Sequence, residues 1–478
     1  MSELVLGLDQ GTSSTRCVAL DGELRELGAH SVPVDSSFPR PGLVEQDPDA
    51  IADSAQRAIA GALAAAGAGV RDVAALGIAN QTETFVVWDR ASGRAVHPAI
   101  VWQDRRTADA CATLGDAADF VRQRTGLELD ATFPATKLRW VLDRVQGGLG
   151  AAQDGRLAYG DVACWLLHRM AGVHVTDAGN AGRSLLCALG GVDWDGELLA
   201  LFGVPRELLP AIVDSDRIEV DAGLPVRAAA GDQQASLFGL RCWAPGATKV
   251  TLGTGAFVLA NAGVEPPFPP PGVLASCAWR RSATTTYALE GFIPTAGAAT
   301  DWFARTGALP GGAELDALLS GPSGDPGVVC VPALQGLGTP AWDAGAAGAL
   351  FGVRLSTTRA DLARAVVDGV LHQVADAVEA IGEPVDALFV DGGLSRSNWI
   401  VQRLADLTGV PARRAARADS TVLGAAGLAG LAAGVWERPD ALPEMPLDLA
   451  ADPALAPAQR EGERERWTAA RELSARWR

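Results

Sequence analysis

The 478-residue chain has few of the residues that build metal centres. Its seven cysteines and five histidines are scattered, and they form no CxxC or HExxH pair. This pattern disfavours a transition-metal site and a disulfide framework, and it fits a reducing compartment. Basic clusters are also missing and the formal charge is −17, which excludes the electrostatic surface that a nucleic-acid binder needs.

Long apolar runs and lysine are scarce as well. No stretch of about 18 uncharged apolar residues occurs, and the first residues lack the basic region of a signal peptide. We therefore expect a cytoplasmic protein that binds neither membranes nor nucleic acid. Lys137 and Lys249 are the only lysines among 40 Lys and Arg residues, a skew that we attribute to a GC-rich genome and not to function.

Short strands and helices alternate along the chain, which predicts an α/β architecture. The chain starts with a strand over 4–8, a glycine turn and a second strand over 15–20, which together are typical of a hairpin. Asp47 and Pro48 then supply the N-cap and first residue of an alanine-rich helix.

The same hairpin pattern occurs again halfway along the chain, with strands over 248–252 and 256–261. A helix over about 358–381 follows, and then a strand over 387–390. Two halves that each begin with such a hairpin indicate a duplicated domain, so we expect an N-terminal lobe over 1–243 and a C-terminal lobe over 244–478. The proline-rich segment 439–457 is expected to be irregular, and 458–478 to form a surface helix.

The two glycine turns, within 9–16 and 251–257, are candidate phosphate sites, because exposed backbone amides and hydroxyls bind phosphate oxygens without lysine. Asp9, at the end of the first strand, is a candidate Mg²⁺ ligand. Ordinary hairpin turns remain the alternative for each segment alone. Neither turn fits the lysine-containing P-loop or the GxGxxG pattern, so the usual nucleotide folds are disfavoured.

Three further polar clusters follow apolar runs. Asp232 comes after 228–230 and suits a base that accepts a proton from a substrate hydroxyl; a helix N-cap is its alternative. Glu83, within 80–84, suits two hydroxyls of a polyol, and Trp102 suits packing on the carbon chain. Their alternative is a core tryptophan beside surface ion pairs.

Together these segments, with YALEG, VPALQGLGTPAWD, GALFGV and VDGGLSRSNW, resemble the FGGY family of carbohydrate kinases. The resemblance runs from residue 6 to about residue 435. It implies an α/β, actin-like (ribonuclease-H-like) fold of two lobes with duplicated topology and a central cleft, in which ATP, Mg²⁺ and a small polyol or sugar meet. It is compatible with a homodimer or a tetramer and does not fix the oligomeric state.

The resemblance also implies residue roles. Asp232 matches the catalytic base, and it matches a metal-binding residue together with Asp9. The residues that match nucleotide-binding positions are Thr12, Ser13, Ser14, Arg16, Thr254, Gly297, Asp301, Gly393 and Ser397. The residues that match substrate-binding positions are Thr82, Glu83, Trp102, Thr132, Asp232, Gln233 and Phe257.

Four of these positions depart from the members of the family that phosphorylate glycerol. Asp301 and Ser397 replace Gln and Asn on the nucleotide side. Thr82 and Thr132 replace an Arg and a Tyr that bind substrate hydroxyls, which enlarges the pocket and removes polar ligands. We expect ATP-dependent phosphorylation of a terminal hydroxyl of a small polyol, with glycerol first and a larger polyol or a ketose as the alternative. A non-enzymatic, actin-like nucleotide switch is a weaker hypothesis, because it has no need of a polyol pocket.

Overall fold

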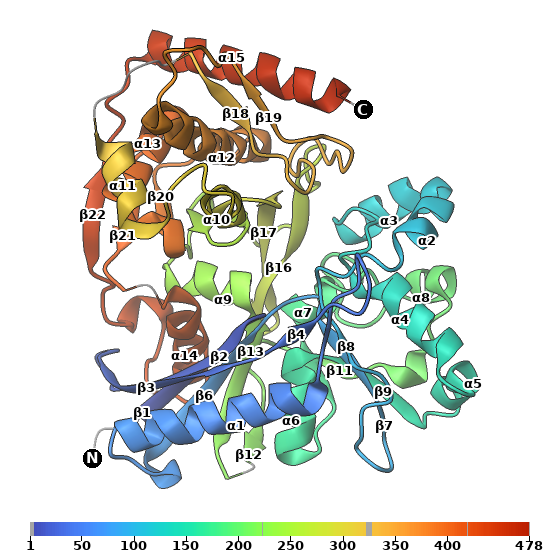
Figure 1. Ribbon diagram of the computed structural model, residues 1–478. Coiled ribbons are helices and arrows are strands. Elements are labelled where there is room, and N and C mark those ends of the chain that lie inside the picture. The colour runs from blue at the N-terminus through green and yellow to red at the C-terminus, as the bar shows by residue number, and fades with distance from the viewer. Residues whose placement is uncertain (1–3, 222, 322–326, 418, 478) are drawn as a thin grey trace.

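The computed structural model describes residues 4–221, 223–321, 327–417 and 419–477, which form two lobes stacked one above the other (Figure 1). The sheet of the lower lobe has the order β12-β13-β6-β1-β2-β3. Its strands are β12 (Val220–Asp221), β13 (Pro225–Gly231), β6 (Val73–Asn80), β1 (Leu4–Gln10), β2 (Ser14–Leu20) and β3 (Glu26–Pro33). The first three strands of the chain pair antiparallel, whereas β6 and β13 extend the sheet in parallel.

The sheet of the upper lobe has the order β16-β17-β15-β14-β20-β21-β22. Its strands are β16 (Leu274–Arg281), β17 (Thr284–Ile293), β15 (Ala256–Gly263), β14 (Thr248–Leu252), β20 (Leu388–Asp391), β21 (Ala412–Ala415) and β22 (Leu447–Ala451). Here too an antiparallel hairpin, β14–β15, is extended on one side by the antiparallel strand β17 and on the other by the parallel strands β20 and β21. The predicted duplication of topology is therefore confirmed.

Helices cover the faces of both sheets. On the lower sheet, α1 (Pro48–Ala65) begins as predicted, with the Asp47 side chain accepting a hydrogen bond from the Asp49 amide at 2.9 Å. On the upper sheet, α12 (Arg359–Ile381) begins with a capping box formed by Thr358 and Asp361. The neighbouring helices of the upper lobe are α10 (Gly297–Arg305), α11 (Gly312–Ser320) and α13 (Asn398–Thr408).

Two helices cross between the lobes. They are α9 (Asp232–Gly239), which follows the lower sheet, and α14 (Ser420–Ala432), which comes from the second half of the chain. A Cβ at Gly424 would lie 1.7 Å from the Ala235 carbonyl oxygen, and a Cβ at Gly77 would lie 1.9 Å from the Ala425 carbonyl oxygen. Glycine is required at these positions because α14 packs backbone to backbone against α9 and the lower sheet.

The rest of the lower lobe is an insertion around a small sheet of order β4-β5-β8-β7-β9. Its strands are β4 (Ser36–Ser37), β5 (Glu45–Gln46), β8 (Ala99–Ile100), β7 (Phe85–Asp89) and β9 (Leu157–Asp161). Its helices are α2 (Ala108–Thr113), α3 (Ala118–Thr125), α4 (Pro134–Arg144), α5 (Gly148–Gln153), α6 (Val162–Ala171), α7 (Ala178–Gly182) and α8 (Gly196–Phe202). Two short pairs, β10 (Val175–Asp177) with β11 (Ala211–Val213) and β18 (Val329–Val331) with β19 (Ala349–Phe351), complete the strands.

The C-terminal segment departs from the prediction in one place. Residues 447–451 form β22, which pairs antiparallel with β21, so the expectation of an irregular segment is wrong there. Most of this edge strand is exposed, so it lacks the apolar alternation that marks a strand in sequence. The predicted terminal helix is confirmed as α15 (Pro457–Arg476), and Trp467 on it is buried against His372. None of the described helices is long and apolar enough to cross a membrane.

Candidate active site

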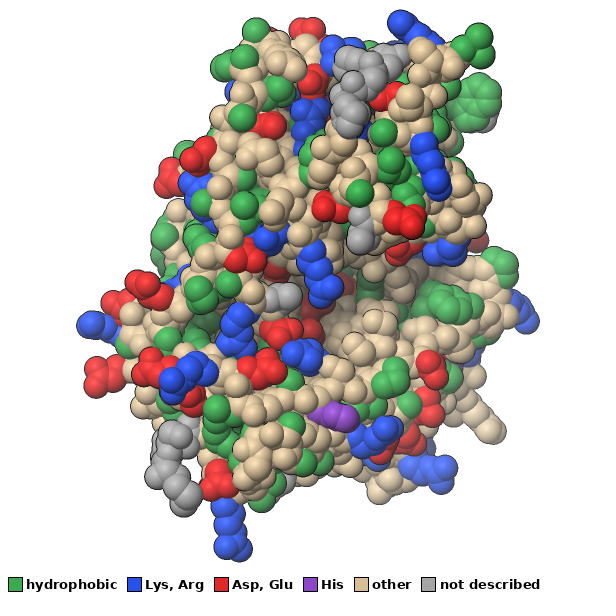
Figure 2. Space-filling view, turned by 60° about the vertical axis from the view of Figure 1, so that its left-hand side comes forward, with side chains coloured by type: hydrophobic (Ala, Val, Ile, Leu, Met, Phe, Trp, Pro, Cys, Tyr) green, Lys and Arg blue, Asp and Glu red, His purple; other side chains and the backbone are tan. Residues whose placement is uncertain are grey.

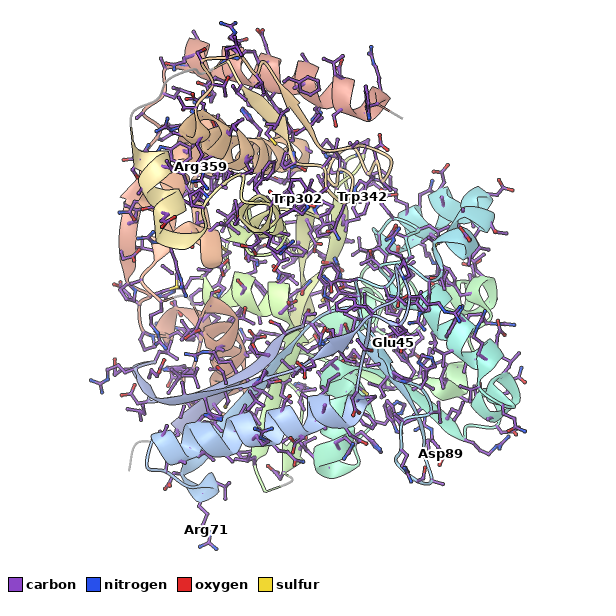
Figure 3. The ribbon with its side chains drawn as sticks, in the orientation of Figure 1. Glu45, Arg71, Asp89, Trp302, Trp342 and Arg359 are labelled. Atoms are coloured by element: carbon purple, nitrogen blue, oxygen red, sulfur yellow. The ribbon has the colours of Figure 1, made fainter. Side chains whose placement is uncertain are left out.

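A cavity of about 90 Å³ lies where the two lobes meet. Figure 2 shows the surface hollowed between the upper and lower parts of the molecule, with acidic and basic side chains beside the hollow. The cavity is lined by all seven residues that the sequence assigns to the substrate, namely Thr82, Glu83, Trp102, Thr132, Asp232, Gln233 and Phe257. Phe292 and Trp342 close it from the upper lobe, and Figure 3 labels Trp342 on the side of that lobe that faces the lower one.

Glu83 is held in a constrained conformation. It lies in the turn between β6 and β7 with a φ of 61°, in the left-handed region that few residues other than glycine adopt. The start of this turn is fixed by a reciprocal amide pair between Asn80 and Asn180, with N–O distances of 3.1 and 2.9 Å. Strain of this kind persists only where surrounding contacts determine it, and it is typical of functional sites.

Arg183 joins two buried carboxylates at the cavity. Its Nε donates to Glu83 Oε1 at 2.6 Å, and its two terminal nitrogens donate to the carboxylate of Glu290 at 2.9 and 3.1 Å. Burial raises the pKa of Glu290, whereas the facing guanidinium opposes that rise. Since Glu290 belongs to β17 and Glu83 to the lower lobe, this buried ion network fixes the β16–β17 arm against the substrate turn.

Asp232 occupies the junction between β13 and α9. The N-cap of α9 is Gly231, so Asp232 does not have the alternative role of a helix cap. The Gln233 amide donates to Asp232 Oδ1 at 2.8 Å. Burial and, after it, the charge of Glu83 raise the pKa of Asp232 to about 6, against the opposing charge of Lys249. A carboxylate with a pKa near the working pH suits a general base.

Both lysines of the chain are fully buried beside this cavity. Lys249 Nζ donates to Gln233 Oε1 at 2.7 Å and to Thr251 Oγ1 at 2.8 Å. Lys137 Nζ donates to the Thr132 carbonyl at 2.8 Å. Each lysine therefore orients a residue of the predicted substrate site.

The first glycine turn lies next to the same cavity. Gly11 donates its amide to the Ser14 carbonyl at 3.0 Å, which closes the turn and leaves the Ser13 side chain exposed. Trp102 Nε1 donates to Thr12 Oγ1 at 3.0 Å, so the predicted phosphate turn directly contacts the predicted substrate pocket. Arg16 forms a two-pronged ion pair with Asp419, at 3.1 and 3.0 Å.

The second turn contacts the start of α10. Thr254 is exposed, and its carbonyl accepts hydrogen bonds from the amides of Ala296 and Ala298. A Cβ at Gly297 would lie 2.7 Å from the Gly253 carbonyl oxygen, so glycine is required for this close approach. The first amides of α10 are therefore donated to carbonyls of the turn, and the exposed side chain of Thr254 is the group that the turn offers to the predicted phosphate site.

The remaining predicted nucleotide residues lie in the upper lobe, outside the polyol cavity. Asp301 is exposed on α10, and Gly393 follows β20 with open space where a Cβ would be. The Ser397 side chain caps α13 and donates a short hydrogen bond to Asp316, so it already has partners within the protein.

Two buried carboxylates each have one oxygen atom without a hydrogen-bond partner. Asp9 Oδ1 and Asp391 Oδ1 are buried without a hydrogen-bond partner. Burial, together with the charges of Asp232 and Asp419, raises the pKa of Asp9 to about 7, against the opposing charge of Arg16. Within the described ranges, no three His, Cys, Asp or Glu side chains are grouped closely enough to hold a metal alone. This arrangement fits Mg²⁺, which keeps several waters and takes its other ligands from phosphates.

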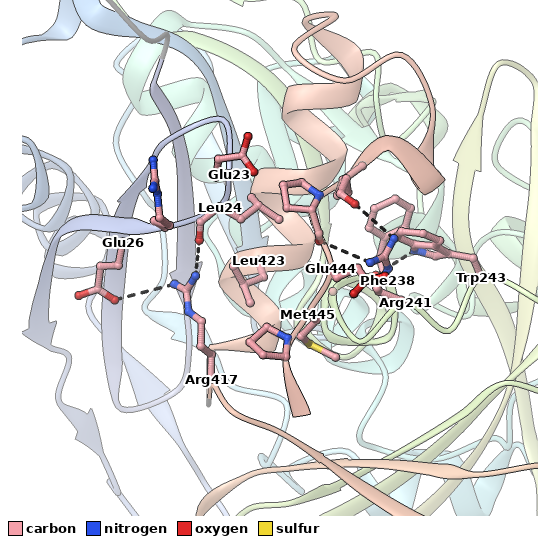
Figure 4. Close-up of a pocket in the computed structure, with 15 residues that line it drawn as sticks. Glu23, Leu24, Glu26, Phe238, Arg241, Trp243, Arg417, Leu423, Glu444 and Met445 are labelled. Carbon is pink, nitrogen blue, oxygen red and sulfur yellow. Dashed lines mark hydrogen bonds and ion pairs between the residues drawn. The ribbon is translucent and has the colours of Figure 1, made fainter. Parts of the chain in front are cut away.

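A larger cavity, of about 380 Å³, lies away from these groups (Figure 4). It occupies the seam between the β2–β3 turn and residues 442–446. Its arginines already have partners: Arg241 donates to the carbonyls of Leu442 and Pro443, and Arg417 donates to the carbonyl of Leu24. Since none of the predicted site residues is among those that line it, we assign the chemistry to the smaller cavity.

Sequence reasoning missed several residues of the site, among them Arg183, Gln234, Lys249 and Glu290. Arg183 contacts partners about a hundred positions away in the chain, so no local pattern indicates it. Signals were available for two of the others. Glu290 lies in the YALEG motif, and Lys249 is one of only two lysines of the chain.

Two regions of the chain match known domains. Residues 4–239 match the N-terminal domain of the FGGY family of carbohydrate kinases, and residues 248–433 match the C-terminal domain of that family. A protein named glycerol kinase from Aromatoleum aromaticum is 42% identical over 490 residues, covering 99% of both chains. Another of that name, from Xanthobacter autotrophicus, is 44% identical over 462 residues, covering 92% of both chains.

Solved structures agree with this match. The crystal structure of Plasmodium falciparum glycerol kinase with ADP has a TM-score of 0.91 at 25% identity and covers 99% of this chain and 98% of that one. A xylulose kinase from Brucella ovis has a TM-score of 0.86 at 27% identity and covers 98% of each chain. The expected α/β, actin-like fold of two lobes is therefore confirmed.

Proposed function

The chain belongs to the FGGY family of carbohydrate kinases, and we propose that it transfers the γ-phosphoryl group of ATP to a terminal hydroxyl of glycerol, forming glycerol 3-phosphate. The observation that carries this proposal is the position of Asp232. Its half-buried carboxylate lines a cavity of polyol size, and the phosphate turn contacts the same cavity through Thr12 and Trp102.

Asp232 has the properties that proton removal from a substrate hydroxyl requires. Its pKa, raised to about 6, leaves the carboxylate ionised at neutral pH and still able to accept a proton. Glu83, fixed by Arg183, offers carboxylate oxygens to the neighbouring substrate hydroxyls. Phe257 and Trp102 contact the carbon chain and exclude water from the reacting atoms.

The nucleotide side is assigned to the two glycine turns. We assign phosphate contacts to Thr12, Ser13, Ser14, Arg16 and Thr254. Asp9 and Asp232 would hold Mg²⁺ through its waters, and the ion, when bound, offsets the charge of the transferring phosphoryl group. The orphaned Oδ1 of Asp9 supports this assignment, because a buried carboxylate oxygen without a partner attracts a hydrated cation.

The rest of the predicted nucleotide site lies in the upper lobe. Gly297, Asp301, Gly393 and Ser397 lie in the upper lobe beyond the second turn, and we assign them to the adenine nucleotide. All seven cysteines are buried and free, which supports a reducing, cytoplasmic location.

An assay that couples ADP release to a spectroscopic readout tests the proposal. We expect ADP release that depends on both glycerol and Mg²⁺, and a product with one phosphate per glycerol. Asp232→Asn keeps the shape of the side chain and removes the base, so turnover is expected to fall by about 10²–10⁴-fold. Polyol-independent release, or an Asn variant within about threefold of wild type, would contradict the proposal.

A further inference from the structure

The seam between the β2–β3 turn and residues 442–446 holds a cavity that has no role in the proposed phosphotransfer. This seam cavity encloses about 380 Å³, compared with about 90 Å³ for the polyol cavity. Its volume lies within the range of roughly 300–1,000 Å³ that is typical of small-molecule sites. Figure 4 shows the side chains of its wall, and the large apolar ones are those of Leu24, Phe238, Trp243, Leu423, Leu442 and Met445. The seam cavity therefore suits a ligand with a compact apolar body.

Contacts within the protein hold the walls of the seam cavity in place. Arg241 donates to the carbonyls of Leu442 and Pro443 at 3.3 and 3.4 Å, and Arg417 donates to the carbonyl of Leu24. Leu24 and Arg241 have φ angles of 55° and 60°, and such left-handed backbone in residues other than glycine persists only where neighbouring contacts determine it. The seam cavity is therefore formed before a ligand arrives, as most small-molecule sites are.

The unpaired charge at the rim of the seam cavity is negative. The arginines that line it already have acceptors in the protein, and the ion pair of Arg25 with Asp21 is 2.8 Å long. Glu23 and Glu444 also line the cavity and are exposed, and within the part of the chain that the structure describes neither of them forms an ion pair. Since the whole chain carries a formal charge of −17, these carboxylates favour a ligand with a positively charged end.

One short helix connects the seam cavity with the candidate base. The eight residues of α9 begin at Asp232, and Phe238 and Gly239 at the other end of this helix line the seam cavity. The remaining walls come from the β2–β3 turn of the lower lobe and from α14 and residues 442–446 of the second half of the chain. A ligand in the seam cavity thus contacts both halves of the chain and favours the arrangement in which the cavity has this shape.

We propose that the seam cavity binds a small amphipathic cation and that this ligand inhibits phosphotransfer. The apolar body of the ligand packs against Phe238, Trp243 and Met445. Its ammonium group lies at the rim, beside Glu23 and Glu444. An enzyme that excludes water from phosphoryl transfer opens and closes in each turnover, so a ligand that favours one arrangement of the two halves lowers kcat. The inhibition rests on the proposed phosphotransfer, whereas the binding does not.

Binding to the wild-type protein gives the first test. The three test ligands share a phenyl ring on a two-carbon arm: phenethylamine is a cation, 2-phenylethanol is neutral and 3-phenylpropionate is an anion. Titration followed by NMR should give a Kd of about 1 mM or below for phenethylamine. The Kd of the neutral alcohol should be at least about threefold higher, and that of the anion higher still. Equal or tighter binding of 3-phenylpropionate, or no binding of any of the three, would overturn the proposal.

Paired charge variants give the second test. Glu23→Gln combined with Glu444→Gln should raise the Kd of phenethylamine at least about threefold and leave that of 2-phenylethanol unchanged. Glu461→Gln combined with Glu465→Gln is the matched control, because it alters the net charge equally at exposed positions of α15 outside the cavity. The same effect in both pairs would show a general attraction to the acidic surface and would overturn the proposed site.

Filling the seam cavity gives the third test. Met445→Trp should abolish the binding of all three test ligands, whereas the control Leu473→Trp, at an exposed position of α15, should keep it. Retained binding in Met445→Trp contradicts the proposed site. Dissociation of an oligomer by the test ligands would show that a second copy of the chain occupies the cavity, and it would also overturn the proposal.

Kinetics test the inhibition. Saturating phenethylamine should lower the kcat for glycerol at least about threefold in the wild-type enzyme, with little change in the KM of glycerol or ATP, and should have no effect on Met445→Trp. Binding without a change in kcat refutes the inhibition, and a rise in the glycerol KM alone would place the ligand in the polyol cavity and overturn the inference. Absence of ADP release with every polyol refutes the phosphotransfer instead, and the binding measurements then still decide whether the seam cavity is a site.

Discussion

The raised pKa of Asp232 makes catalysis depend on pH. Burial and Glu83 disfavour the ionised carboxylate and raise its pKa from the ordinary 3.8 to about 6. Since the base must be ionised to accept a proton, we expect kcat/KM to fall as the pH drops through about 6 and to be level above it. At pH 5 a base with a pKa of about 6 is mostly protonated, so a kcat/KM that stays constant down to pH 5 would contradict this assignment.

The buried cation of Lys249 should affect polyol binding through Gln233. Lys249→Met keeps the length of the side chain but leaves Gln233 Oε1 and Thr251 Oγ1 without their donor. We expect the polyol KM to rise about tenfold, because Gln233 loses its fixed orientation in the cavity. Steady-state kinetics with ATP saturating measures the change, and an unaltered polyol KM at normal thermal stability would show that the lysine only fills space.

Most residues of the candidate site could be predicted from sequence, since they follow buried strands. Asp232 directly follows β13, and Glu83 lies in the turn that follows β6; the carboxyl ends of these parallel strands meet at one edge of the sheet. Arg183 could not be predicted. Its partners Glu83 and Glu290 lie about a hundred positions away in the chain, and only the packed structure brings them together.

At the scale of elements, the hairpins and capped helices were predictable because their signals are local. The glycine turns mark the hairpins, and Asp47 and Thr358 mark the starts of α1 and α12. The helix α14 carries glycines that read as breakers in sequence. They are required because this helix contacts α9 and β6 through its backbone, a constraint that is invisible in a local pattern.

The crossing of α9 and α14 makes a prediction about stability. In Gly424→Ala the new Cβ would meet the Ala235 carbonyl oxygen at 1.7 Å, so the helices must separate. We expect the free energy of unfolding to fall by about 2–3 kcal/mol, as for overpacked cores. Chemical denaturation measures this difference.

Gly462→Ala is the control for that variant. Gly462 lies within α15 with no atom within 4 Å of a new Cβ, so alanine should stabilise the protein by about 0.5–1 kcal/mol through helix propensity alone. If both variants change stability equally, the tight helix crossing is not what fixes glycine at position 424.

At the scale of the whole molecule, both lobes supply the walls of one cavity. The lower lobe contributes Glu83 and Trp102, and the upper lobe contributes Phe257 and Glu290. The Arg16–Asp419 ion pair connects β2 to the residue that precedes α14, which places another contact between the two halves of the chain. Ligands held by both lobes favour the arrangement in which the lobes approach each other.

Polyol and nucleotide binding should therefore be coupled. Thr12 belongs to the proposed phosphate turn and accepts a hydrogen bond from Trp102 of the proposed polyol cavity, so each ligand should order a contact that the other uses. We expect saturating glycerol to tighten the binding of a non-hydrolysable ATP analogue by about fivefold or more, measured by calorimetry. Linkage requires the analogue to tighten glycerol binding by the same factor.

Trp102→Phe removes the indole donor and should weaken the coupling in both directions. Equal affinities with and without the other ligand would show that the lobes bind their ligands independently.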